Sequence, residues 1–377
     1  MRAAASPYNS EGPREARPQL VDPRLAALPA VPWIPPVLRR VWRDVGILQI
    51  GIDGDRAIVL GGITPERYRL INSINGRRSS AQLIAQGPWL GLTADDIVAV
   101  LRQLHASGVL VDLGAVPAET DSGWHPENDR GLLPDLAARL LSPASGTPQQ
   151  VAAARAHSQV LIHGGRRVGS VIAGALAAAG LGRINVVERA PVDASDVTGG
   201  GFGLDDVGAD HSDALARLVK RVSDSASTAR LSPLESPDLL ILTETWPGPD
   251  ERERSLQRSG TPYLCATVRE RRAVIGPFVV PGESSCLQCQ HLSRRDRDPQ
   301  WPAIYGQLRM QPHRPEDAGE SALALLAGSL ASIQALQWFD GERLPETINT
   351  TLEIGLPDLV LTRRFWPRHP LCTCQRA

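Results

Sequence analysis

Four cysteines in two close pairs are the residues whose types and spacing point most directly to chemistry. They are Cys286-x-x-Cys289 and Cys372-x-Cys374. Four thiolates complete a tetrahedral structural zinc site and leave no position for a catalytic water. We therefore predict a zinc ion that anchors the C-terminal segment and does not hydrolyse a substrate, with free thiols or a redox pair as the alternative. Cys265, inside an apolar run, is expected to be a small buried hydrophobe and not a nucleophile.

A glycine-rich segment carries the second candidate site. VLIHGGRRVGSVIAGALAAAGLGRINVVE indicates a strand, a tight turn, a helix of small residues and a second strand. In nucleotide-binding folds, turn glycines let backbone amides approach phosphate, and an acid ending the second strand binds ribose hydroxyls. Gly164, Gly169 and Glu188 fit these roles, and Gly165 lies in the same turn. Arg166 occupies the place of the middle glycine, so either its guanidinium contacts phosphate or the turn is purely structural.

The elements around this turn predict an α/β domain. A strand at 159–163, a helix at 168–179 and a strand at 183–188 form a βαβ pattern with short joints. Apolar runs at 239–243 and 261–267 are expected to be later strands of the same sheet. We therefore expect an α/β domain with an open, largely parallel sheet.

The chain before this domain has a different pattern. Two β-rich runs flank Asp53-Gly54, a tight-turn signal for a hairpin. Thr64-Pro65 and Thr93 provide N-caps for two helices, the second with an apolar face at Ile97, Val100, Leu101 and Leu104. These elements predict a small winged-helix-like α+β domain over residues 41–118, which follows an irregular arm over 1–40. Residues 119–155 are expected to be a linker, with a helix at 132–141.

Composition narrows the function classes. The 377 residues suggest two domains, and 42% hydrophobic with 21% charged residues is typical of globular proteins. The 40 basic and 41 acidic side chains provide no global electrostatic field that would attract nucleic acid.

The apolar stretches at 169–182 and 322–338 are too short or too interrupted to predict a membrane span, and no secretory segment is visible. Clustered thiols indicate a reducing compartment, so we expect a cytoplasmic protein without membrane or nucleic-acid partners. Neither a Ser-His-Asp arrangement nor an HExxH motif supports a hydrolase.

The ordered motifs resemble the ThiF/MoeB/HesA superfamily, which has the ubiquitin-activating-type adenylyltransferase fold. The resemblance covers residues 156–377. It is carried by Gly169-Ser170, by Ala177-Ala-Ala-Gly-Leu-Gly-Arg-Ile184, by Gly260-Thr-Pro262, by Pro281-Gly-Glu283 before the first cysteine pair, and by Ala327-Gly-Ser329 with Gln334-Ala-Leu336 before the second. It implies an α/β, Rossmann-like ThiF-type domain with a zinc site of four cysteines and a site for ATP.

Departures from the family pattern fall on its catalytic residues. The acidic pair after the second strand reads Glu188-Arg189-Ala190, and the phosphate-binding arginine is absent from 195–201. The family's lysine falls near His211, and its catalytic Thr-Asp-Asn falls on Thr243-Glu244-Thr245. Because adenylation needs positive charge to offset the charge that develops on the phosphates, we predict a degenerate adenylation site with ATP binding in doubt.

A winged-helix-like module before a ThiF-type domain resembles the leader-peptide-binding partner proteins of thiazole/oxazole-modified microcin biosynthesis. The resemblance implies a scaffold that binds a precursor peptide and presents it to a YcaO-type cyclodehydratase in ribosomal peptide maturation. The small domain would act as a precursor-peptide recognition element and add the leader as a strand at 56–60, beside the helix face at 97–104. The resemblance also implies that the protein forms a homodimer.

Two other functions remain open. An active adenylyltransferase would activate a peptide or sulfur-carrier carboxylate, with Glu188 on ribose, Arg166 on phosphate and Glu244 as the metal-binding acid. A nicotinamide oxidoreductase is the weaker alternative, because the middle glycine is missing and the cysteine pairs follow downstream.

Overall fold

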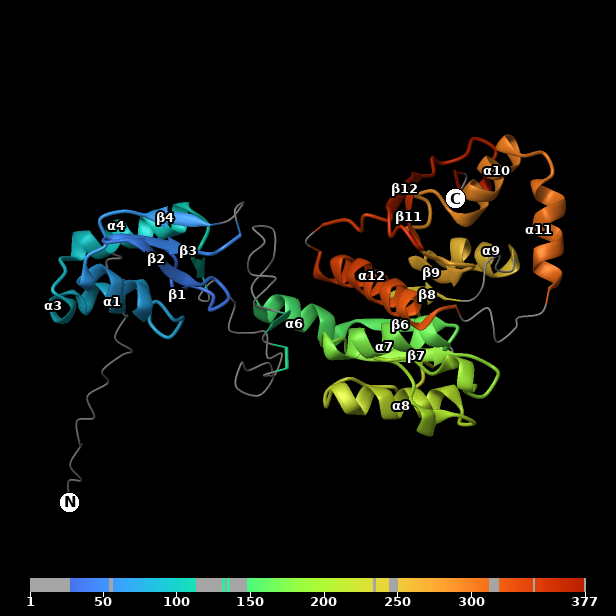
Figure 1. Cartoon of the computed structure of the whole chain (residues 1–377), viewed down its shortest axis with the longest axis horizontal. Coiled ribbons are helices and arrows are strands. Elements are labelled where there is room, and N and C mark those ends of the chain that lie inside the picture. The colour runs from blue at the N-terminus through green and yellow to red at the C-terminus, as the bar shows by residue number, and fades with distance from the viewer. Residues whose placement is uncertain are drawn as a thin grey trace, which may run out of the picture. The chain divides into compact units, whose positions relative to one another are not determined.

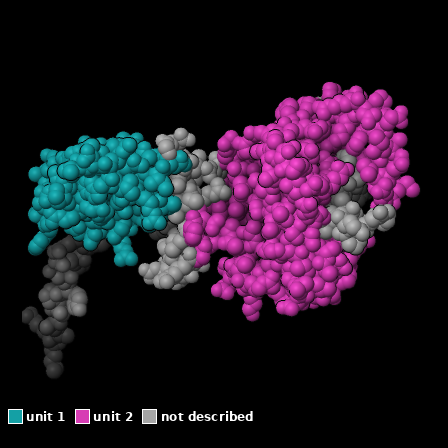
Figure 2. Space-filling view, viewed as in Figure 1, with its two compact units in different colours: residues 1–115 teal, residues 116–377 magenta. Residues whose placement is uncertain are grey.

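The chain divides into two compact units, Met1–Ala115 (unit 1) and Val116–Ala377 (unit 2), coloured separately in Figure 2. The structure is a computed structural model. It describes residues 28–53, 57–112, 131–132, 134–135, 148–232, 235–243, 250–311, 319–341 and 343–375. Most of the predicted 132–141 helix and the turn residue Gly54 lie outside the described residues.

Unit 1 combines a small antiparallel sheet with helices (Figure 1). Its three-stranded sheet has the order β2-β3-β4. The strands are β2 (Arg40–Asp44), β3 (Ile47–Ile50) and β4 (Ile58–Leu60), and the helices are α1 (Pro65–Ser73), α2 (Ser80–Ala85), α3 (Gly87–Leu90) and α4 (Ala94–Ala106). A separate pair joins β1 (Pro32–Trp33) to β5 (Val111–Asp112) in antiparallel register and so links the two ends of the unit.

The predicted N-caps are confirmed. The Thr64 side chain accepts a hydrogen bond from the backbone N–H of Arg67, and Thr93 forms a reciprocal capping box with Asp96. The apolar face of α4 is buried in the core of unit 1; its members are Ile97, Val98, Val100, Leu101 and Leu104. The helix face expected at 97–104 to contact a peptide therefore already packs against its own unit.

Two expectations for unit 1 need correction. The folded unit begins before residue 41, because β1 pairs with β5. Ile34, which belongs to the predicted arm, is buried, with 1% of its surface exposed. The first β-rich run is also two strands and not one. β2 and β3 pair across a turn at Asp44-Val45-Gly46, in which Gly46 takes a positive φ of 71°. The sheet therefore has one more strand than the predicted hairpin.

Unit 2 is built on a seven-stranded sheet of order β12-β11-β10-β9-β8-β6-β7. The strands are β6 (Gln159–His163), β7 (Arg183–Val187), β8 (Leu239–Leu242), β9 (Tyr263–Arg269), β10 (Arg272–Val279), β11 (Thr350–Gly355) and β12 (Leu361–Phe365). The pairs among β7, β6, β8 and β9 are parallel, as the βαβ pattern predicts. The pairs from β9 through β12 are antiparallel, so the sheet is parallel only over its first half.

Helices accompany the sheet of unit 2. The helices of unit 2 are α6 (Pro148–His157), α7 (Arg167–Ala178), α8 (His211–Val222), α9 (Asp250–Ser259), α10 (Leu287–Arg297), α11 (Trp301–Met310) and α12 (Ser321–Asp340). α12 packs on β9, β10 and α7. Glycine allows the approach to α7, because a Cβ at Gly328 would lie 2.5 Å from Cγ1 of Val171. α12 is also long and apolar enough to span a bilayer, whereas the sequence predicted that the stretch at 322–338 is too interrupted to do so. Of its most apolar 18-residue window, 44% is buried within the fold.

A buried ion pair fastens α6 to the rest of unit 2. Arg155 donates from Nε and Nη2 to the Asp340 carboxylate at 2.7 and 2.9 Å, and from Nη1 to the Ala179 carbonyl at 2.9 Å. Both charged side chains are 1% exposed. α6 thus begins inside the range predicted as a linker and forms part of the α/β unit.

Candidate functional site

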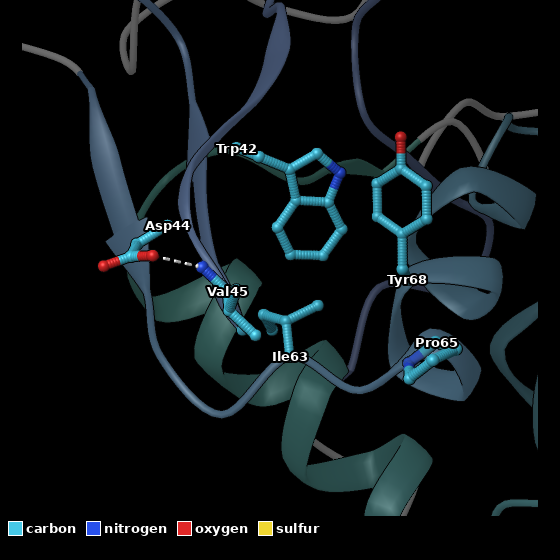
Figure 3. Close-up of a pocket in the computed structure, with 7 residues that line it drawn as sticks. Trp42, Asp44, Val45, Ile63, Pro65 and Tyr68 are labelled. Carbon is cyan, nitrogen blue, oxygen red and sulfur yellow. Dashed lines mark hydrogen bonds between the residues drawn. The ribbon is translucent and has the colours of Figure 1, made fainter.

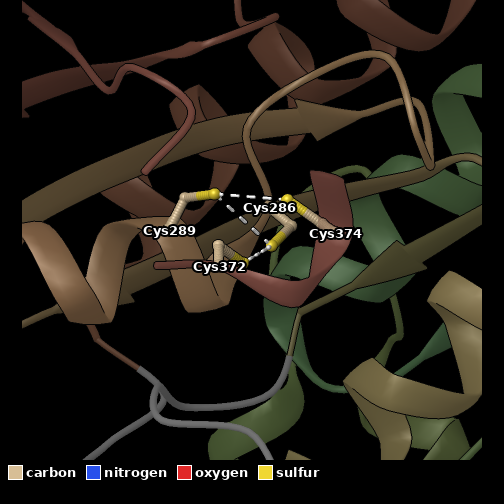
Figure 4. Close-up of side chains that lie close together, drawn as sticks. All are labelled: Cys286, Cys289, Cys372 and Cys374. Carbon is tan, nitrogen blue, oxygen red and sulfur yellow. Dashed lines mark hydrogen bonds between the residues drawn. The ribbon is translucent and has the colours of Figure 1, made fainter. Parts of the chain in front are cut away.

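The four clustered cysteines converge in unit 2 (Figure 4). Cys286 caps α10 and Cys289 lies in its first turn, whereas Cys372 and Cys374 come from the C-terminal segment. All four are buried, and their sulfurs lie within 4.8 Å of one another. The sulfur–sulfur distances are 3.8 Å for Cys286–Cys289 and 3.5 Å for both Cys286–Cys372 and Cys289–Cys374. Tetrahedral zinc with Zn–S bonds of about 2.3 Å requires sulfurs about 3.8 Å apart, so the donor set fits a metal ion.

The electrostatics of the cluster also favour a cation. Hydrogen bonds from the Cys286 and Cys372 side chains hold the pKa of Cys289 far below its usual range. Burial raises the pKa of Cys374. Four thiolates cannot share so small a buried volume without a positive charge, because each desolvated anion repels the others. A divalent metal ion would supply that charge and hold the two chain segments together.

Further contacts fix the C-terminal segment beside α10. The backbone N–H of His369 donates to the Cys289 sulfur at 3.3 Å, and His369 Nε2 lies 2.7 Å from the Asp296 carboxylate. The indole N–H of fully buried Trp366 donates to Thr351 at 3.0 Å, and the Arg294 guanidinium carbon lies 4.4 Å from the Trp366 ring centroid. These contacts orient the segment that delivers Cys372 and Cys374.

The glycine-rich turn forms the second site, between β6 and α7. Gly164 has a φ of 95°, which favours glycine. A Cβ at Gly169 would collide with the Gly164 carbonyl oxygen, so the helix can start this close to the turn only without a side chain. The Thr243 hydroxyl donates to the same carbonyl at 2.5 Å. The sequence thus produces the tight strand–turn–helix geometry of a nucleotide-binding fold.

Charged side chains above this turn are paired within the protein. Arg166 Nε lies 3.9 Å from Glu188 Oε2, and Arg166 Nη1 lies 3.7 Å from Asp196 Oδ1. His211 Nε2 lies 3.9 Å from Asp196 Oδ2. The His211 ring also fills the space above Gly165, where a Cβ would collide with it. We call these four side chains the turn cluster: Arg166, Glu188, Asp196 and His211.

The turn cluster has little positive charge to offer a nucleotide. Its one guanidinium faces two carboxylates, and His211 Nδ1 is satisfied by the Ala190 carbonyl at 2.7 Å. The side chains of Asp196 and His211 are only 2% and 1% exposed. Within the described residues, Asp196 Oδ1 and His211 Nε2 have no hydrogen-bond partner. The one guanidinium of the cluster is thus directed at carboxylates of the protein, in contrast to a set of cations directed at phosphate.

The structure brings most of the predicted residues together. Gly164, Gly165, Arg166, Gly169 and Glu188 surround one turn, and the four cysteines form one cluster. Glu244, the candidate metal-binding acid, lies outside the described residues.

Sequence reasoning missed Asp196 as a member of the site. The available signal was the spacing of Asp193 and Asp196, which form a capping box around the short helix η2 (Ala194–Asp196). That box buries Asp196 close to the guanidinium of Arg166.

Comparison with known proteins identifies structural relatives only. No family model and no curated protein sequence matches the chain. Escherichia coli MccB, solved with ATP, superposes with a TM-score of 0.65 and 16% identity over 91% of this chain and 99% of that chain. The same values hold for the microcin C7 biosynthetic enzyme MccB in complex with N-formylated MccA. PaaA superposes with a TM-score of 0.64 and 15% identity over 87% of this chain and 98% of that chain. At such identities the comparison establishes a shared fold.

Proposed function

We propose, from the ThiF-like fold shared with MccB and PaaA, that this protein is a zinc-stabilised scaffold of ribosomal peptide maturation. It binds a precursor or leader peptide and presents it to a YcaO-type cyclodehydratase in the cytoplasm. The observation that carries this proposal is the pairing of Arg166 with both Glu188 and Asp196. The guanidinium at the nucleotide turn faces two carboxylates of the protein itself, so we assign the modifying chemistry to another protein.

Charge development during adenylation explains why this pairing matters. Negative charge builds on the phosphates as pyrophosphate leaves, and preorganised cations stabilise it. Here Glu188 and Asp196 compensate Arg166, and His211 stands near the position of the family's lysine. A bound triphosphate would have to displace these contacts before Arg166 could stabilise a transition state.

A peptide partner is supported by the structural relatives and by unit 1. The MccB structure in complex with N-formylated MccA is a ThiF-like fold with its peptide bound. Unit 1 has a small sheet whose outer strands β2 and β4 each pair on one side only among the described residues, and strand addition to such an edge is a common mode of peptide recognition. We assign unit 1 the role of a winged-helix-like precursor-peptide recognition element.

A homodimer is also part of the proposal. α12 is apolar on all sides, which is typical of a helix covered on both faces, yet Ile333 on α12 is 45% exposed. The edge strand β12 exposes Leu361 and Phe365 by 53% and 64%. A second copy of unit 2 would cover these side chains.

Peptide titration of the zinc-loaded full chain tests the scaffold role. We expect saturable binding of fluorescein-labelled precursor peptides encoded beside this gene, measured by fluorescence anisotropy, with unchanged affinity when ATP and Mg²⁺ are added. A scrambled peptide of the same composition is the control. The absence of saturable binding for every such precursor would contradict the peptide-binding role.

An active adenylyltransferase remains the second candidate function, because the strand–turn–helix geometry around Gly164 is intact. It requires a guanidinium that can turn to phosphate, and the variant Asp196→Asn would remove one of the two carboxylate charges that face Arg166. In the parent, the backbone N–H of Asp193 donates to Asp196 Oδ2 at 2.9 Å. The side-chain oxygen of asparagine can accept the same hydrogen bond. We expect this variant to bind ATP about fivefold more tightly than the parent, which corresponds to about 1 kcal/mol.

Isothermal titration calorimetry with ATP measures this effect, and Asp206→Asn is the matched control. Asp206 caps the short helix η3 (Leu204–Asp206) and pairs with Arg217 at 2.8 Å, as Asp196 caps η2 and pairs with Arg166. Unchanged ATP affinity in Asp196→Asn would show that internal pairing is not what weakens nucleotide binding.

A further inference from the structure

An apolar pocket opens beside the sheet of unit 1 (Figure 3). Its volume is about 540 Å³, and it lies between the β2–β3 turn and the start of α1. The lining residues are Trp42, Asp44, Val45, Gly46, Ile63, Pro65 and Tyr68. The rings of Trp42 and Tyr68 are in contact, with centroids 4.9 Å apart and planes tilted by 44°. The pocket is large enough for one bulky apolar side chain.

The pocket lies against an open sheet edge. β2 is an outer strand of the order β2-β3-β4, so one side of its backbone has no strand partner among the described residues. Apolar side chains at this edge are exposed: Trp42 by 48% and Val45 by 96%. A strand added to β2 would place alternate side chains over the groove between β2 and α1.

Charge at the groove indicates what the added strand would carry. Arg40 precedes Trp42 by two positions on β2, so both side chains lie on the same face of the sheet. Its Nε is buried and has no hydrogen-bond partner in the described part of the chain. Burial lowers the pKa of Arg40, so its charge is incompletely solvated. A carboxylate two positions from the apolar side chain would complement this guanidinium.

The sequence suggested the opposite edge of the sheet, residues 56–60, where β4 also pairs on one side only among the described residues. The apolar pocket and the exposed Trp42 lie on the β2 side.

We propose that the groove between β2 and α1 binds an extended peptide by strand addition to β2. A large apolar side chain fills the Trp42–Tyr68 pocket, and an acidic side chain two positions away pairs with Arg40. This inference rests on the proposed peptide-binding function and gives it a location and a peptide pattern.

The test uses two fluorescein-labelled probe peptides on the zinc-loaded full chain. Their central sequences are Lys-Thr-Phe-Thr-Glu and Glu-Thr-Phe-Thr-Lys, which match antiparallel and parallel addition, because Asp44 lies beyond Trp42 on β2. We expect saturable anisotropy for at least one probe. Replacing its Phe with Ala should weaken binding about tenfold, and replacing its Glu with Gln should weaken it about fivefold.

Variants of the protein locate the bound peptide. Trp42→Ala should weaken probe binding about tenfold and Arg40→Gln about fivefold. Val59→Thr, at a 49% exposed position on the opposite edge strand β4, should leave binding unchanged. Circular dichroism checks that each variant is folded, and the Ala-substituted probe tests the pocket on the unmodified protein.

The outcomes separate this inference from the proposed function. If encoded precursor peptides bind but the probes do not, or if Val59→Thr impairs binding while Trp42→Ala does not, the β2 groove is excluded and the scaffold role survives. If neither precursors nor probes bind, both proposals fail.

Discussion

Replacing Cys372 with serine is expected to abolish metal binding and strongly destabilise unit 2. The four buried sulfurs lie between α10 and the C-terminal segment, so we expect the loss of one thiol to release a bound metal ion together with the cross-link that it would form. We expect the free energy of unfolding to fall by about 3 kcal/mol or more, which corresponds to a decrease of about 10 °C in Tm for a unit of this size. Inductively coupled plasma mass spectrometry would find one zinc per chain in the parent and none in the variant, and calorimetry would record the Tm.

Cys265→Ser is the matched control. Cys265 is a half-buried cysteine on β9, outside the four-sulfur cluster. Its replacement should leave the zinc content intact and change Tm far less. Equal zinc content in Cys372→Ser and the parent would contradict the assignment of Cys372 as a ligand. A metal-free parent with all four thiols reduced would contradict the site itself.

The second large effect is expected at Arg155. In Arg155→Met, the Asp340 carboxylate, 1% exposed, loses both hydrogen bonds from the guanidinium and its compensating charge. Removing one partner of a buried pair costs about 3–5 kcal/mol. α6 would detach from the rest of unit 2 more readily, because the Ala179 carbonyl also loses this donor. Chemical denaturation of the zinc-loaded chain measures the free energy of unfolding.

A double variant and an exposed pair serve as controls for this effect. Arg155→Met combined with Asp340→Leu removes both charges and should recover much of the lost stability. Arg183→Met breaks a pair with Glu235 whose side chains are 30% and 42% exposed, and should cost about 1 kcal/mol or less. A similar loss in Arg155→Met and Arg183→Met would show that burial of the Arg155 pair is not what stabilises α6.

Local signals in the sequence predicted much of the fold. The N-caps at Thr64 and Thr93 and the βαβ pattern around Gly164 depend on neighbouring residues, and the structure confirms them. The turn at Val45-Gly46 was missed. Val45 is apolar and lies between two apolar runs, so the whole segment was expected to form one strand. The antiparallel half of the sheet also escaped prediction, since its pairing joins β10 to the distant β11.

For the candidate sites too, local spacing could be predicted from the sequence and tertiary contacts could not. Cysteine spacing predicted that the four cysteines would come together as a set that fits a metal ion, because ligand number and type can be read from the sequence. The pairing of Arg166 with Asp196 and the contact between Trp42 and Tyr68 depend on tertiary packing. Neither pair has a spacing rule from which sequence alone could predict it.

The most direct test of the account is ATP–pyrophosphate exchange by the zinc-loaded full chain with a bound precursor peptide. The pairing of Arg166 with Glu188 and Asp196 predicts exchange no faster than that of a Gly169→Val variant, whose side chain would obstruct the turn. Robust, peptide-dependent exchange that Gly169→Val abolishes would show an active adenylation site and contradict the scaffold function.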